Sequence, residues 1–225
     1  MISSVGKSAT ESWKSVCEGK SGINTITHFD PTEFSSRIAG EVKDYDPLAY
    51  FDRKEVRKYD PYIQFALIAS DEAMKDAGLS GKSERYGVYI GSGIGGIQTI
   101  EDNKEVLLKR GPSRISPFFL PSSIANLAAG QVSIKHGLKG PNLANVTACA
   151  TSTHSIGDSF RIIQRGEADV VVAGGAEYPI TPLGMAGFAV MKALSTRNDE
   201  PQKASRPFDK NRDGFVAAEG AGIMI

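Results

Sequence analysis

The chain has 225 residues, of which 40% are hydrophobic and 23% are charged, so it can bury a globular core. Its 26 basic residues balance its 26 acidic ones, which argues against binding to nucleic acid or an anionic membrane through overall charge. No apolar stretch approaches the roughly 20 residues of a membrane span, and the first residues lack the pattern of a signal peptide. We expect a soluble, cytoplasmic protein with one continuous domain over residues 1–225.

The first clear element is a helix from Asp60 to Gly78. Asp60 suits an N-cap, Pro61 suits the first turn, and Gly78 suits the C-terminal end. Apolar residues recur between them at helical spacing, so we expect the helix to bury one face.

Two short apolar runs, residues 86–91 and 169–175, are rich in β-favouring residues and end in glycine, which is typical of buried strands. Between them, residues 152–165 are predicted to form a helix that buries Ile156, Phe160 and Ile163 on one face. Residues 222–225, GIMI, form a further strand-like run. Strands that alternate with helices predict an α/β fold.

Residues 91–96, GSGIGG, follow the first strand and match the dinucleotide fingerprint G-x-G-x-x-G. A nucleotide site would also need a second strand ending in an acid roughly 20 residues later. That region, residues 114–121, is instead bracketed by prolines and predicts a loop. We favour a glycine turn that shapes an apolar pocket near Ile94 over a nucleotide site.

Residues 209–214, DKNRDG, resemble the start of a calcium-binding EF-hand loop. Position 12 of such a loop should be a bidentate glutamate, but here it is Gly220, with Glu219 one place early. The pattern therefore favours a structural turn, and we expect no metal site.

Residues 145–152, NVTACATS, run from an apolar segment through small residues into a helix. This pattern places Cys149 near a helix N-terminus, where the helix dipole favours the thiolate, the nucleophilic form of cysteine. A buried structural cysteine is the alternative, because a lone cysteine is often core.

The remaining candidates are weaker. Cys17 shares a predicted helix with Trp13 and is expected in the core. His154 lies five residues after Cys149, roughly 140° around a helix, so it is expected to point away from the thiol and to pair with Asp158. His28 and His136 lie in loop-like segments with no assigned role.

The segment TACATS, residues 147–152, resembles the active-site signature of the β-ketoacyl-acyl-carrier-protein synthases. Further segments resemble the elongating enzymes of type II bacterial fatty-acid synthesis in the same order along the chain: residues 91–96, 115–119, 173–177, 193–198, 206–209 and 212–215. The resemblance implies the thiolase-like fold, of which this chain would be the first of two α/β/α halves, incomplete at both ends.

The resemblance also implies a 3-oxoacyl-[acyl-carrier-protein] synthase, an acyltransferase in which a cysteine takes an acyl group and condenses it with malonyl-carrier, with loss of carbon dioxide. Cys149 would be the nucleophile, and its own N–H one oxyanion donor. The acyl pocket would be lined by Ile94, Phe119 and Phe188, with Phe119 reaching the pocket of the other subunit of a homodimer. The docking residues for acyl carrier protein would be Lys54, Arg57, Lys58, Arg114 and Lys192.

No cofactor is implied, since the substrates are carried on the phosphopantetheine of the carrier. The family's catalytic histidines and lysine would lie outside residues 1–225, so this chain alone is expected to be inactive. A non-catalytic partner that binds carrier protein or mediates dimerisation is the competing hypothesis. Retention of Cys149 in an intact motif favours the enzyme.

Overall fold

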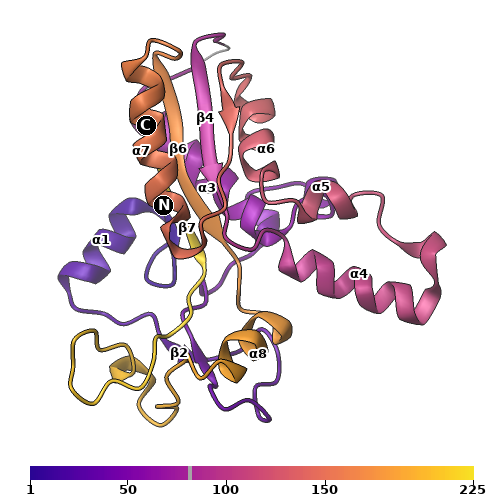
Figure 1. The fold of residues 1–225 in the computed structure, drawn as a ribbon, viewed down its shortest axis with the longest axis vertical. Coiled ribbons are helices and arrows are strands. Elements are labelled where there is room, and N and C mark those ends of the chain that lie inside the picture. Colours follow the sequence, from indigo (N-terminus) through magenta and orange to yellow (C-terminus); the bar gives the residue numbers. More distant parts are fainter. Residues whose placement is uncertain (81–82) are drawn as a thin grey trace. The chain divides into compact units, whose positions relative to one another are not determined.

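The computed structural model describes residues 1–80 and 83–225, which divide into two compact units. The first unit comprises Met1 and residues 46–177 and 220–225, and the second comprises residues 2–45 and 178–219. Figure 1 shows the chain coloured along its sequence. Each unit is built from segments that are far apart in the sequence.

A mixed sheet forms the centre of the first unit, with four of its strands in the order β7-β6-β4-β5. Their bounds are Tyr86–Gly91 for β4, Asn142–Leu143 for β5, Val170–Glu177 for β6 and Gly220–Met224 for β7. Strand β4 runs parallel to β5 and β6, whereas β7 runs antiparallel to β6. All three predicted strands are therefore confirmed, as β4, β6 and β7.

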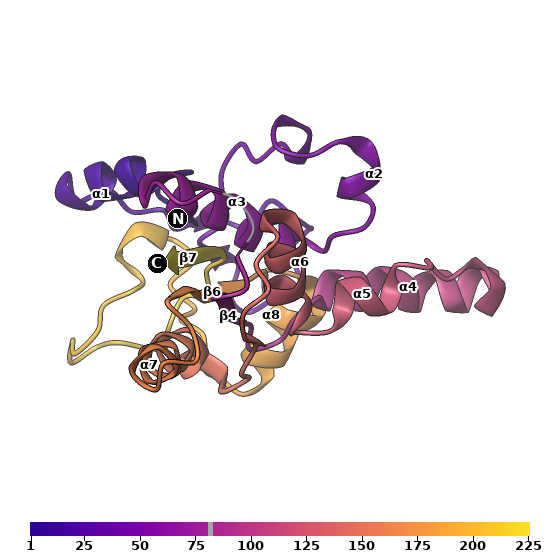
Figure 2. The same ribbon diagram turned by 90° about the horizontal axis from the view of Figure 1, so that it is seen from above.

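Helices cover both faces of this sheet. The covering helices are α3 (Pro61–Asp76), α6 (Leu127–His136) and α7 (Thr151–Gln164), and the unit also contains α2 (Arg53–Val56), α4 (Ile97–Arg110) and α5 (Phe119–Ser123). Helices α3 and α6 lie on one face and α7 on the other (Figure 2). The predicted α/β class is confirmed. Among the described residues, no helix combines the length and apolar character needed to cross a membrane.

Helix α3 begins as predicted, with the Asp60 side chain accepting a hydrogen bond from Tyr62 N at 3.1 Å. Its first half is more deeply buried than the predicted single apolar face, because every residue from Tyr62 to Ser70 is buried. This half of α3 packs against the sheet and against α6.

The buried face of helix α7 differs from the predicted one. Phe160 is 61% exposed and Ile163 is 44% exposed, whereas the buried residues are Thr151, Ser155, Ser159 and Ile162. The Ser155 and Ser159 hydroxyls donate to the carbonyl oxygens four residues earlier, so their burial leaves no hydroxyl unsatisfied. Small side chains let this face of α7 approach the sheet closely, which the apolar pattern does not reveal.

The second unit contains helices α1 (Ala9–Cys17) and α8 (Pro182–Val190), the strand β1 (Ile2–Ser3) and a hairpin-like pair. In that pair, β2 (Asn24–Thr25) runs antiparallel to β3 (Ile38–Ala39). A separate core holds the unit together, and its buried members are Ile26, Ala39, Ile180, Met185, Leu194 and Ala217.

Candidate active site

Cys149 is exposed and lies in a short 3-10 turn, Ala148–Ala150, that leads directly into α7. The turn is closed by hydrogen bonds from Ala150 N to Thr147 O, at 3.1 Å, and from Thr147 N to Thr151 Oγ1, at 2.8 Å. Ala148 adopts a φ of 51°, a left-handed conformation that is unfavourable for alanine. The buried-cysteine alternative is therefore wrong, and the thiol faces solvent at a helix N-terminus.

The amide of Cys149 is available as a donor. No described residue accepts a hydrogen bond from it, and α7 has no side-chain cap on its first turn. Unpaired N–H groups at a helix N-terminus favour negative charge. This turn can therefore stabilise both a thiolate and an oxyanion next to it.

Glycines let the ends of β4 and β6 approach this turn. A Cβ on Gly91 would lie 2.3 Å from Thr151 Cγ2 and 2.6 Å from Asn145 O, and one on Gly175 would lie 3.0 Å from Ser152 Cβ. Because contacts under 3.0 Å require something to shift, a side chain at position 91 would displace the start of α7. Gly91, the last residue of β4, pairs with Gly175, two residues before the end of β6, so together they set where the helix begins.

The glycine loop after β4 donates hydrogen bonds to a carboxylate of the protein itself. Glu177, the last residue of β6, accepts hydrogen bonds from Ser92 Oγ at 2.7 Å, Gly93 N at 2.6 Å and Ile94 N at 3.2 Å. The Ser92 hydroxyl also accepts from Gly95 N at 2.8 Å. Burial raises the pKa of Glu177 above its usual value, although these hydrogen bonds oppose the shift.

A second carboxylate of the chain accepts a hydrogen bond from the first turn of the helix that follows the loop. Asp60 Oδ2 accepts from Thr99 N, in the first turn of α4, at 2.9 Å, and a Cβ on Gly96 would lie 3.0 Å from the same oxygen. Burial raises the pKa of Asp60 to about 6, against the hydrogen bond from Thr99. A dinucleotide would place its pyrophosphate on such loop amides and helix N-terminus, so two carboxylates of the chain occupy the equivalent groups here.

Sequence reasoning missed both roles. Asp60 was expected only as a cap for α3, and Glu177 was noted only within a family motif. The signal for Glu177 was its place two residues beyond Gly175, which pairs with Gly91 in the parallel register. This offset puts its side chain level with the loop. The loop predicted over residues 114–121 is also partly wrong, because α5 begins at Phe119.

The predicted pocket residues fall in different surroundings. Ile94 lies in the glycine loop and is 37% exposed, and Phe119 is the first residue of α5. Phe188 belongs to α8 in the second unit, where it packs on that unit's core and meets the Phe215 ring edge-on, with centroids 5.5 Å apart. The structure thus brings Ile94 into the loop that Glu177 holds.

The predicted docking cations are open to solvent in large part. Lys54, Arg57 and Arg114 are exposed, and Lys58 is half-buried. The Lys58 ammonium lies 5.8 Å from the centroid of the Phe118 ring, which adds a cation–π contact. Lys192 is exposed in the second unit. None of the five forms an ion pair with a described residue.

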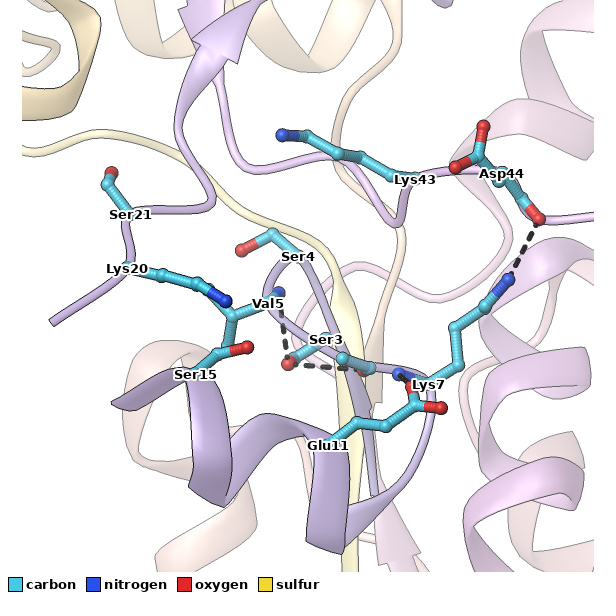
Figure 3. Close-up of a pocket in the computed structure, with 11 residues that line it drawn as sticks. Ser3, Ser4, Val5, Lys7, Glu11, Ser15, Lys20, Ser21, Lys43 and Asp44 are labelled. Atoms are coloured by element: carbon cyan, nitrogen blue, oxygen red, sulfur yellow. Dashed lines mark hydrogen bonds between the residues drawn. The ribbon is translucent and has the colours of Figure 1, made fainter. Parts of the chain in front are cut away.

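A cavity of about 260 Å³ lies in the second unit, beside α1 (Figure 3). Its charged lining residues are Lys7, Glu11, Lys20, Lys43 and Asp44. The Lys7 ammonium donates to Asp44 O at 3.3 Å, and Lys7 N donates to Glu11 Oε2 at 2.8 Å. None of the predicted site residues lines this cavity.

Three expectations about side chains need correction. Cys17 is exposed at the end of α1, not in the core. His154 hydrogen-bonds Thr147 Oγ1 through Nδ1 at 2.8 Å, whereas its expected partner Asp158 accepts from Tyr89 Oη at 3.0 Å. His136 is the last residue of α6, not part of a loop.

His28 also has partners, the buried carboxylates Glu41 and Glu219 of the second unit. Its Nε2 lies 3.1 Å from both carboxylate oxygens of Glu219, and its Nδ1 lies 3.7 Å from Glu41 Oε1. Burial lowers the pKa of His28, but the hydrogen bond and charge of Glu219 raise it by more. This cluster links segments that are distant in sequence but belong to the same unit.

The DKNRDG segment is a structural turn, as expected. Asp213 accepts from Ser195 Oγ at 2.7 Å and from Thr196 N at 2.9 Å, and Asp209 accepts from Asn211 N at 2.7 Å. Within residues 1–80 and 83–225, no three His, Cys, Asp or Glu side chains are grouped to hold a metal ion.

Comparison with known proteins shows which proteins this chain is similar to. The 3-oxoacyl-[acyl-carrier-protein] synthase 2 of Vibrio cholerae is 54% identical over 228 aligned residues, covering 100% of this chain and 55% of that protein. The chain thus spans about half the length of the curated relatives that it matches.

Two solved structures have the same fold. A β-ketoacyl synthase from Burkholderia phymatum superposes with a TM-score of 0.86 at 28% identity, over 99% of this chain and 56% of that one. A type II polyketide ketosynthase, solved with its acyl carrier protein and a bound hexaketide, gives a TM-score of 0.78 at 32% identity, over 99% and 54%. The predicted thiolase-like fold is confirmed.

Residues 1–225 also match the profile of the family described as "Beta-ketoacyl synthase, N-terminal domain". Because this match spans every residue of the chain and agrees with the relatives and the fold, the chain belongs to the β-ketoacyl synthase family.

Proposed function

We propose that the full-length protein is a 3-oxoacyl-[acyl-carrier-protein] synthase of fatty-acid elongation and that Cys149 carries the acyl group. The observation that carries the proposal is the exposed thiol in the turn before α7, in a chain 54% identical to a protein of that name. The support from relatives covers only the half of their length that this chain matches.

In the proposed first step, the Cys149 thiolate attacks the thioester carbonyl of an acyl carrier. A C–S bond forms, the carbonyl oxygen takes the negative charge, and the unpaired Cys149 N–H donates to that oxygen. Collapse of the intermediate breaks the bond to the carrier's thiol, which leaves as a thiolate and takes up a proton. The acyl group then remains on Cys149 as a thioester.

In the second step, malonyl-carrier loses carbon dioxide, and the electrons of the broken C–C bond form a new C–C bond to the acyl carbonyl. The Cys149 thiolate leaves, and 3-oxoacyl-carrier is the product. The step needs no oxidant, reductant or metal, since the two C–C bonds and the departing thiolate balance. The substrates would arrive on phosphopantetheine.

We assign Ile94, Phe119 and Phe188 to the acyl pocket on the strength of the family resemblance. The placement of Ile94 in the glycine loop supports its part of this assignment. Replacement of Ile94 with phenylalanine should shorten the products, since each buried methylene contributes about 0.8 kcal/mol. An unchanged distribution of product lengths would show that Ile94 does not line the acyl pocket.

We assign carrier docking to Lys54, Arg57, Lys58, Arg114 and Lys192, because solvent-accessible cations without ion-pair partners can steer an acidic protein. Reversal of charge at Arg57 and Lys58 should raise the apparent KM for acyl-carrier in a salt-dependent way. Equal kinetics in variant and parent would mean that these cations are solvated surface charges that do not dock the carrier. A cytoplasmic homodimer stays a prediction from the resemblance.

The test of the function is turnover by the full-length protein supplied with acyl-carrier and malonyl-carrier. Formation of 3-oxoacyl-carrier and release of carbon dioxide should be lost in Cys149→Ala, by about a thousandfold or more. The matched control is Cys17→Ser, which removes the other exposed thiol and should keep full activity. Activity of Cys149→Ala within tenfold of the parent would overturn the assignment. Binding of carrier without turnover in the parent would instead favour the non-catalytic partner.

A further inference from the structure

The half-buried Glu177 carboxylate, the glycine loop and the Cys149 turn form one connected arrangement in the first unit. Glu177 receives hydrogen bonds from Ser92 Oγ, Gly93 N and Ile94 N. Hydrogen bonds to a carboxylate are stronger than neutral ones, and these three fix three consecutive residues of the loop. The Glu177 carboxylate therefore fixes the conformation of the loop.

The held loop lies against the turn that presents the thiol. A Cβ built on Gly93 would be 2.9 Å from Glu177 Oε2 and 3.5 Å from Ala148 O. Ala148 has the positive φ that aims the next residue, Cys149. A residue in an unfavourable conformation persists only when its surroundings hold it, and the Gly93 backbone is part of those surroundings.

We infer that Glu177 is a positioning residue for Cys149, acting through the Ser92–Gly95 loop to hold the Ala148 turn in the conformation that places the thiol at the start of α7. The inference deepens the proposed function, since the thiol it positions is the one assigned to acyl transfer. The same carboxylate fixes Ile94 N, so it also sets the position of the residue assigned to the acyl pocket.

The decisive variant is Glu177→Gln. It preserves the shape of the side chain, but one oxygen becomes an NH₂ group that must face a donor, either Gly93 N or the pair formed by Ser92 Oγ and Ile94 N. Ser92→Ala is the milder second variant, because it removes only the hydroxyl that joins the carboxylate to Gly95 N.

The measurement is iodoacetamide labelling of the full-length protein followed by peptide mapping, with Cys17 as an exposed internal reference in every sample. Cys149 is already exposed, so access does not limit its labelling. In Glu177→Gln the Cys149-to-Cys17 rate ratio should fall about two- to fivefold, the effect of losing a helix-dipole interaction. Ser92→Ala should lower the ratio in the same direction but by less.

The control for a general loss of stability is Val132→Ala, a fully buried position on α6 in the same unit. It should lower the melting temperature and leave the labelling ratio unchanged. If Glu177→Gln and Ser92→Ala lower the melting temperature but also leave the ratio unchanged, Glu177 is merely structural and the inference is overturned.

A second readout is the chain-length distribution of the products, which should broaden in Glu177→Gln because Ile94 is released. Labelling requires no acyl substrate, so the two proposals can fail separately. A parent without condensation activity whose labelling ratio still depends on Glu177 would sink the proposed function and support the positioning role. If the parent is active but Glu177→Gln leaves both the labelling ratio and the product lengths unchanged, the proposed function stands and the positioning role of Glu177 is overturned.

Discussion

Two loops of this protein resemble ligand-binding motifs. In both, other residues of the chain form the hydrogen bonds that a ligand would form. The GSGIGG loop, residues 91–96, offers backbone amides as a phosphate site would, but Glu177 accepts them. The DKNRDG loop, residues 209–214, offers carboxylates as a calcium site would, but Ser195, Thr196 and Asn211 donate to them. A motif thus indicates the chemistry of the groups a loop presents, while the fold decides what satisfies those groups.

The two loops differ in what they touch. The glycine loop lies against the carbonyl of Ala148, next to Cys149, in the first unit. The aspartate loop braces Ser195 and Thr196 in the second unit. We therefore expect changes around the first loop to alter both stability and the reactivity of Cys149, and changes in the second to alter stability alone.

The largest expected effect comes from Gly91→Ala. The new methyl group would lie 2.3 Å from Thr151 Cγ2 and 2.6 Å from Asn145 O, so the start of α7 must move. We expect a loss of about 3 kcal/mol or more in the free energy of unfolding, with slower labelling of Cys149. Urea denaturation and peptide mapping check both effects.

Gly157→Ala is its matched control, because Gly157 lies inside α7 and a Cβ there meets nothing within 4 Å. This change should stabilise the helix by up to about 1 kcal/mol and leave labelling unaltered. Similar stabilities for the two variants would show that the strand end does not constrain the start of α7.

A pH dependence should follow from Asp60, which holds the far end of the glycine loop through Thr99 N. Burial raises the pKa of Asp60 from 3.8 to about 6. Between about pH 4 and 6 the folded protein keeps a proton that the unfolded chain has lost, so the contribution of Asp60 to stability falls as the pH rises. The loss is at most about 3 kcal/mol, at 1.36 kcal/mol for each pKa unit.

The measurement is the free energy of unfolding of the parent and of Asp60→Asn across this pH range. Since the variant cannot titrate at position 60, the difference between the two proteins should shrink as the pH rises from 4 to 6. Parallel curves would mean that the carboxyl group is not perturbed by burial.

The smallest effect should come from the aspartate loop. Asp213→Ala removes the acceptor for Ser195 Oγ and Thr196 N and should cost about 1 to 2 kcal/mol. Labelling of Cys149 should not change, and added calcium should not raise the melting temperature of the parent. A calcium-dependent shift that disappears in Asp213→Ala would contradict the structural role of this loop.

The sequence predicted the local elements well where one signal dominated. Asp60, Pro61 and Gly78 mark α3 because caps and turns are local features, and the apolar runs of β4 and β6 need only their own residues. The small-residue turn before α7 likewise predicted an exposed thiol. These features depend on neighbours in the chain.

Other features depend on partners that are distant in sequence. Glu177 lies 85 positions after Ser92 and reaches it only through the parallel register of β4 and β6. The buried face of α7 could not be predicted from apolar residues, because Ser155 and Ser159 satisfy their hydroxyls within the helix. Cys17 looked like core beside Trp13, yet Trp13 is 69% exposed.

The central claim is that Cys149 carries the acyl group. Its most direct test is to mix the full-length protein with acyl-carrier alone, digest it under conditions that preserve thioesters, and locate the acyl mass by peptide mapping. We predict that the acyl group appears on the Cys149 peptide, that Cys17 stays unmodified, and that Cys149→Ala gives no acyl-protein. An acyl group on Cys17, or on any residue in Cys149→Ala at the parent's rate, would contradict the account.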